Sequence, residues 1–135
     1  MKTHLEFRSA GFQPYPGEVD EMNPGRFGKR LAEFLVHALA AAGFHAEEPA
    51  AEDWGWNISI RNDSFPLSVG CGNYEEYPDG FLCFITPSQP FVRKWFRKVP
   101  TEAIVAKVAN VLETSLRKHP DVRDLRWSAD MGVDA

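Results

Sequence analysis

Apolar and polar side chains alternate most clearly over residues 54–61, where Trp54, Trp56, Ile58 and Ile60 occupy every second position. Successive side chains of a β-strand point to opposite faces, so this spacing predicts a half-buried strand. The two tryptophans and two isoleucines are expected to face the core, and the small or polar residues between them to face the other way. The segment therefore indicates a sheet with one packed face and one polar face.

Four further segments have strand patterns: residues 3–8, 65–72, 81–86 and 122–128. Segment 81–86 is apolar at both alternating sets of positions, which favours a place inside the sheet over one at its edge. The turn residues at 62–64 separate the strand at 54–61 from the one at 65–72 and indicate that these two strands are neighbours.

Two segments, residues 24–42 and 101–118, have the three-to-four-residue apolar spacing of amphipathic helices. Asn23 is expected to cap the first helix, and Gly43 to end it in a left-handed conformation. Pro120 is expected to stop the second helix, because proline cannot continue a helical hydrogen-bond ladder.

The predicted order of elements is β-α-β-β-β-α-β, within a single domain over residues 1–135. If both helices cross over in the same right-handed sense, they cover the same face of the sheet. We therefore predict an α+β two-layer sandwich, with a five-stranded mixed sheet and two helices on one face. Gly70 and Gly72 would line a shallow shelf on the open face, with Leu82 and Phe84 as exposed hydrophobes.

This topology places the connecting loops at two ends of the sheet. Phe12 and Tyr15 are expected at the same end as the 88–99 loop. The acidic loops 45–53 and 75–79 are expected together at the opposite end. Long irregular connections in compact domains commonly serve function, which makes the first end the stronger candidate for a site.

The 88–99 loop contains the strongest candidate binding segment, the basic-aromatic segment Arg93, Lys94, Trp95, Phe96, Arg97 and Lys98. The two aromatic rings can stack on nucleic-acid bases, and the four cations around them can contact phosphates, an anionic membrane surface or an acidic protein. The alternative is a short helical turn whose rings are tucked under the sheet and whose cations are merely solvated. The sequence leaves both interpretations open.

Cys71 lies between two glycines and is the one residue that resembles an exposed nucleophile. Pairing strands 65–72 and 81–86 about Tyr77 places Cys71 opposite Cys83, with both facing the helices. We therefore expect buried thiols that pack as small hydrophobes, with a cross-strand disulfide as the alternative. The histidines show no metal-like pairing, and neither a P-loop nor a dinucleotide motif occurs, so we predict no catalytic residue, metal site or cofactor.

Composition changes this picture little, because 44% hydrophobic and 25% charged residues are typical of a globular domain of 135 residues. The net charge of −4 argues against general nucleic-acid binding, which needs a basic face, without excluding a local basic patch. No apolar run has the length of a signal peptide or a membrane span, which predicts a cytoplasmic protein.

Two segments, Glu52-Asp53-Trp54-Gly55-Trp56 and Gly70-Cys71-Gly72, resemble parts of small single-domain bacterial proteins of uncharacterised function. The resemblance implies no activity and brings no functional residues with it. Small acidic α+β proteins rich in aromatic residues also include immunity proteins that neutralise toxins, which is a likeness of composition alone.

Three hypotheses for function follow. The leading one is a non-enzymatic protein-binding module, immunity-like in composition, that uses Phe12, Tyr15 and the basic-aromatic segment. The alternative is single-stranded nucleic-acid binding through the basic-aromatic segment. The third is an enzyme with a pocket beneath the loops of Phe12 and Trp95, which would use Cys71 or nearby carboxylates.

Overall fold

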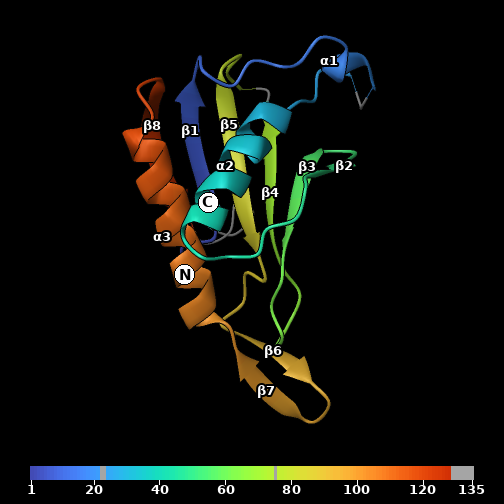
Figure 1. Ribbon diagram of the computed structural model, residues 1–135, viewed down its shortest axis with the longest axis vertical. Coiled ribbons are helices and arrows are strands. Elements are labelled where there is room, and N and C mark those ends of the chain that lie inside the picture. The colour runs from blue at the N-terminus through green and yellow to red at the C-terminus, as the bar shows by residue number, and fades with distance from the viewer. Residues whose placement is uncertain (22–23, 75, 129–135) are drawn as a thin grey trace.

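The computed structural model describes residues 1–21, 24–74 and 76–128, in which helices cover one face of an antiparallel sheet (Figure 1). The helices are α1 (Glu18–Glu21), α2 (Lys29–Ala41) and α3 (Glu102–Lys118). The strands are β1 (His4–Ser9), β2 (Ala50–Glu52), β3 (Gly55–Ile60), β4 (Leu67–Asn73), β5 (Gly80–Thr86), β6 (Phe91–Lys94), β7 (Arg97–Pro100) and β8 (Val122–Ser128). All five predicted strands and both predicted helices are present, and α1, β2, β6 and β7 are additional.

Six strands form one sheet in the order β2-β3-β4-β5-β1-β8, with every neighbouring pair antiparallel. Strands β6 and β7 form a separate two-stranded sheet. Helix α2 contacts β3 and β4, and α3 contacts β5 and β8, so both lie on the same face. The predicted α+β class is therefore confirmed, whereas the predicted five-stranded mixed sheet is wrong.

The short strand β2 explains the difference in strand directions. Because the chain forms β2 between α2 and β3, strands β3, β4 and β5 all run opposite to the predicted direction, and β5 is antiparallel to β1. The N–H of Ser9, at the end of β1, donates to the carbonyl oxygen of Asp79 at 2.9 Å. The acidic 74–79 loop therefore lies at the end of the sheet near Phe12 and Tyr15, and the basic-aromatic segment lies at the opposite end (Figure 1).

The hydrophobic core lies between the sheet and the two long helices. Side chains with 0–1% exposure recur every three or four residues along each helix: Leu31, Leu35, Leu39, Val105, Val108, Leu112 and Leu116. Burying a side chain of this kind contributes about 1.5–3 kcal/mol, so these two stripes hold the helices on the sheet. Gly43 follows the end of α2 with a φ of +95°, as predicted from the freedom of glycine in left-handed backbone.

A carboxylate distant in sequence caps the start of α2. The N-cap residue is Gly28, later in the chain than predicted, and Asn23 lies outside the described residues. The N–H groups of Gly28 and Lys29 donate to Oε2 of Glu18 at 2.8 and 2.9 Å. Glu18 thus supplies both an acceptor and negative charge where the first backbone N–H groups of the helix lack intrahelical partners.

Aromatic rings fill the glycine shelf on the open face of the sheet. A Cβ atom at Gly70 would lie 2.2 Å from Cζ of Phe84, so only glycine leaves room for that ring. Trp54, predicted to face the core, instead packs on Phe84 with 4.9 Å between ring centroids and is 38% exposed. Gly55, with a φ of +154°, interrupts the strand alternation directly after Trp54.

Candidate functional site

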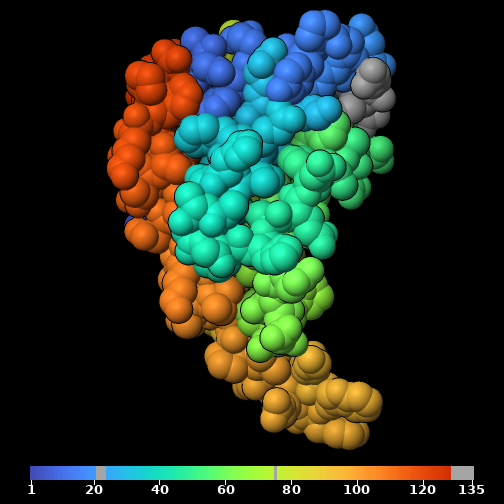
Figure 2. Space-filling view, in the orientation of Figure 1, coloured from blue at the N-terminus to red at the C-terminus, as the bar shows by residue number. Residues whose placement is uncertain are grey.

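The β6–β7 hairpin projects from the end of the sheet and contains the whole basic-aromatic segment (Figure 2). Val92 and Val99 pack against the core where the hairpin leaves the body of the protein. The N–H of Thr101 donates to the carbonyl oxygen of Pro90 at 3.0 Å, and its hydroxyl donates to that of Gln89. These contacts fix the base of the hairpin and thereby set the position of its tip.

The tip is a two-residue turn formed by Trp95 and Phe96 between the paired residues Lys94 and Arg97. Trp95 is 87% exposed and Phe96 is 100% exposed. Trp95 occupies the first position of this turn and has a φ of +61°. Glycine is favoured at that position when φ is positive. A bulky side chain in this conformation costs about 1–3 kcal/mol, so tryptophan at this position lowers the stability of the hairpin.

Four cations lie behind the tip in two facing pairs, Arg93 opposite Lys98 and Lys94 opposite Arg97. Within the described ranges, none of the four forms an ion pair. Like charges directly opposite each other destabilise a strand pair. An anionic partner would neutralise these cations and thereby reduce the repulsion within each pair.

The interpretation of the basic-aromatic segment as a helical turn with tucked rings is therefore wrong. The sequence does contain a signal for the hairpin, because it is nearly symmetric about Trp95 and Phe96. A valine, a basic residue and a second basic residue precede the two rings, and two basic residues and a valine follow them. That symmetry predicts the observed register, with Val92 opposite Val99.

Phe12 was predicted as a binding residue, and the structure places its side chain in the core. It is 4% exposed. Its ring packs against the rings of Phe34, Phe81 and His119, with centroid distances of 5.4, 5.9 and 4.8 Å. Its loop closes over one end of the core, whereas Trp95 lies beyond the other end, so the two residues share no pocket.

Tyr15 is half-buried, and its carbonyl oxygen accepts a hydrogen bond of 3.0 Å from the N–H of Glu18, the first residue of α1. Helix α1 lies at the end of the sheet opposite to the hairpin (Figure 1). The hydroxyl of Tyr15 donates to a carboxylate oxygen of Glu33, and this hydrogen bond raises the pKa of Tyr15. The guanidinium of Arg30 lies over its ring, with Cζ 3.9 Å from the centroid. The structure thus separates Tyr15 from the basic-aromatic segment and gives it neighbours on α2.

The two cysteines pair across the sheet as predicted. Cys71 lies opposite Cys83, both are 0% exposed, and both are free thiols. Burial raises the pKa of Cys71 well above its usual value. A thiol that is buried and protonated is a poor nucleophile, so these residues act as core side chains.

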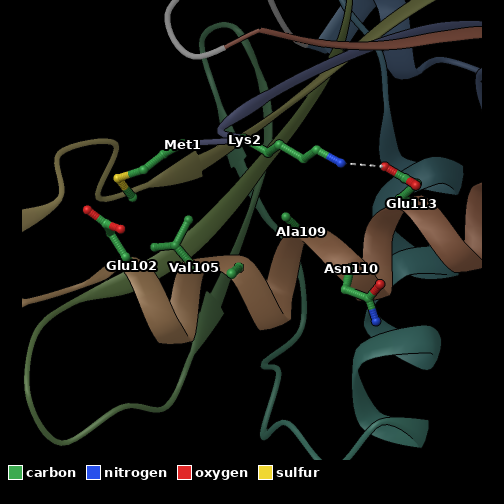
Figure 3. A pocket seen from close by; sticks show the side chains of 8 residues that line it. Met1, Lys2, Glu102, Val105, Ala109, Asn110 and Glu113 are labelled. Atoms are coloured by element: carbon green, nitrogen blue, oxygen red, sulfur yellow. Dashed lines mark hydrogen bonds and ion pairs between the residues drawn. The ribbon is translucent and has the colours of Figure 1, made fainter.

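A hollow of about 330 Å³ lies along α3 beside the first two residues (Figure 3). Val105 and Ala109 line it, and Nζ of Lys2 reaches Oε1 of Glu113 at 3.4 Å. Oε1 of Glu113 also accepts a hydrogen bond of 2.6 Å from the indole Nε1 of Trp127, which lowers the pKa of Glu113. Glu113 therefore joins α3 to β8 as a structural partner.

Over residues 1–21, 24–74 and 76–128, no three histidine, cysteine or carboxylate side chains gather as metal ligands. In that same part of the chain, no helix combines the length and the apolar character needed to cross a membrane. No family model, curated protein or solved structure matches this chain. The geometry of the β6–β7 hairpin therefore makes it the candidate site.

Proposed function

We propose that this protein is a non-enzymatic binding module that recognises an acidic surface of another protein through the β6–β7 hairpin. The observation that supports this most directly is the exposure of Trp95 and Phe96, at 87% and 100%, between four cations. Tryptophan and arginine are enriched among the residues that dominate binding energy at protein interfaces. Burial of the two rings would supply affinity, and the surrounding cations would select an acidic partner.

The charge distribution favours the hairpin over the rest of the surface. The hairpin contributes four cations and no acid to a chain with a net charge of −4, so the remaining residues carry a net charge of −8. An acidic partner is therefore attracted at the hairpin and repelled elsewhere. Such asymmetry orients the encounter and raises the rate of association.

Single-stranded nucleic acid is the second candidate ligand, because the same rings could stack bases and the same cations could contact phosphates. Proteins of that kind combine stacking rings with a basic groove that follows the nucleic-acid backbone. Here the four cations of the site lie on one narrow hairpin, and the remaining residues carry a net charge of −8, which favours a protein partner. A cytoplasmic location remains part of the proposal.

The proposal is tested by affinity capture from cell extract, with and without nuclease, using the purified chain as bait. Reversing the charges of Arg93, Lys94, Arg97 and Lys98 to glutamate should remove the captured protein. The matched control reverses four exposed carboxylates outside the hairpin to lysine: Glu47, Glu48, Glu52 and Glu76. This control should retain the partner.

Two results would contradict the proposal. A partner lost by the control but kept by the hairpin variant would move the site to the acidic loops. Capture that nuclease abolishes would instead favour the nucleic-acid hypothesis.

A further inference from the structure

We infer that the partner contributes an extended acidic segment that adds as a strand to the outer edge of β6. This inference rests on the proposed function and specifies how the hairpin would hold its partner. Main-chain hydrogen bonds would supply affinity in such strand addition, and alternating side chains would supply specificity.

The register of the hairpin determines which backbone groups face outward. Residue pairs of an antiparallel ladder alternate between hydrogen-bonded and open pairs, and a two-residue turn is closed by a hydrogen-bonded pair. The next pair, Arg93 and Lys98, is therefore open, and its N–H and C=O groups point away from the hairpin. The pair of Phe91 and Pro100 is open for the same reason.

The two edges of the hairpin differ in their capacity to pair. On β7, Pro100 has no N–H, which leaves Lys98 as the single outward donor. On β6, both Phe91 and Arg93 present an outward N–H and C=O. Among the described residues these groups have no hydrogen-bond partner. A further strand can therefore pair with β6 more completely than with β7.

A hollow of about 420 Å³ lies beside β6, between residues 92–94 and the 62–66 loop, and no residue of β7 lines it. Figure 1 shows that loop next to β6. Phe65 and Val92 give the hollow an apolar part, and Arg93 and Lys94 give it two cations. Asp63 is the single acid in the lining. A strand whose side chains alternate between apolar and acidic matches this arrangement.

An acidic segment of a partner fits this edge better than a second copy of the chain does. Pairing β6 with β6 of another copy would place like charges opposite each other, which is unfavourable.

The edge of the main sheet at β8 is less suited to strand addition than the edge of β6. The β1–β8 ladder shifts register, and Asp124 in β8 has a φ of +56°. Such irregularities disfavour strand addition.

The probe for this inference is a short synthetic peptide of alternating glutamate and valine, measured by isothermal titration calorimetry against a control with lysine in place of glutamate. We expect the glutamate peptide to bind and the lysine peptide not to bind. In the complex, the amide protons of Phe91 and Arg93 should exchange more slowly, while that of Lys98 stays unchanged.

Three variants separate the backbone contribution from the charge. Arg93→Pro removes the outward N–H and the charge, Arg93→Gln removes the charge alone, and Lys98→Pro makes the matched change on the opposite edge. All three should fold, because proline already occupies an open pair at position 100. Arg93→Pro should weaken binding about five- to tenfold beyond Arg93→Gln, the loss expected for one backbone hydrogen bond.

Equal affinities of Arg93→Pro and Arg93→Gln would overturn the inference, as would an equal or larger loss in Lys98→Pro. Failure of the wild-type chain to bind the glutamate peptide would also overturn it. After any of these three results, the proposed function would still stand if capture of a partner protein depended on the hairpin. The rings at the tip would then bind the partner without strand addition.

Discussion

The indole Nε1 of Trp56 donates a hydrogen bond of 2.9 Å to Oε2 of Glu18, the same oxygen that caps α2. The other carboxylate oxygen, Oε1, accepts the N–H of Tyr15 at 2.9 Å. One carboxylate, 3% exposed, therefore joins the N-terminal loop, the start of α2 and strand β3. Burial of such a group is tolerated because its oxygens are hydrogen-bonded.

Glu18→Gln should lower the free energy of unfolding by about 2–3 kcal/mol, because an amide offers one acceptor oxygen where four N–H groups converge. Urea denaturation followed by circular dichroism measures the change. The control Glu48→Gln, at an exposed position, should shift stability by about 0.5 kcal/mol or less. In a double-mutant cycle with Trp56→Phe, additive losses would show that the Glu18–Trp56 contact contributes nothing.

The buried thiol of Cys71 should make the fold less stable in alkali. Its pKa is raised in the folded state, so the unfolded chain loses this proton at lower pH than the folded one. The contribution is complete below the usual thiol pKa of about 8.5 and declines above it, by at most about 1.4 kcal/mol per pH unit. Cys71→Ala should show a shallower decline above pH 8.5 in urea titrations, and identical slopes would contradict the assignment.

Asp79 joins β1 to β8 through two arginines, accepting from Nε of Arg8 at 2.9 Å and from Nη2 of Arg123 at 2.6 Å. The hydrogen bond from Arg8 is the largest cause of its lowered pKa. The stabilisation is present above the unfolded pKa of about 3.9 and is lost as the pH falls through the lower folded value.

Asp79→Asn should therefore be less stable than the wild type at pH 7 and approach it below about pH 4 in thermal melts. Asp63→Asn, at an exposed position without an ion pair among the described residues, is the control and should match the wild type throughout. A constant difference between Asp79→Asn and the wild type at every pH would show that the charge of Asp79 is not responsible.

The like-charged pairs of the hairpin predict a conflict between stability and binding. Replacing Arg97 and Lys98 together by glutamate creates opposite charges across β6 and β7 and should protect the hairpin amides more strongly from hydrogen exchange. The melting temperature of the whole fold should change little, because these side chains are exposed. Partner capture should nevertheless be lost, and retained capture would show that the charge pattern serves no binding role.

Periodicity in the sequence predicted the elements that form the core. The apolar stripes of α2 and α3 and the register that places Cys71 opposite Cys83 follow from local spacing. The predicted strand directions are wrong, because the true directions depend on β2, whose three residues are exposed and carry no alternating pattern. Missing this strand of three residues was sufficient to assign the 74–79 loop and the basic-aromatic segment to the wrong ends of the sheet.

The candidate site was predicted in composition but not in geometry. The basic-aromatic segment was identified from its residue types, whereas its hairpin became evident only from the pairing about Trp95 and Phe96. Phe12 was predicted to bind because it lies in a long irregular loop, yet its ring fills the end of the core. The anchoring of the hairpin by Thr101 depends on contacts with Gln89 and Pro90 that residue spacing does not reveal.

Site-specific photocrosslinking tests whether the tip of the hairpin contacts a protein partner. Benzoylphenylalanine is placed at Phe96 on the hairpin tip and, as the control, at Tyr77, which is 38% exposed on the 74–79 loop at the other end of the sheet. We expect a nuclease-resistant protein adduct in cells from position 96 and none from position 77. An adduct from position 77 alone, or a nucleic-acid adduct from position 96, would contradict the proposed function.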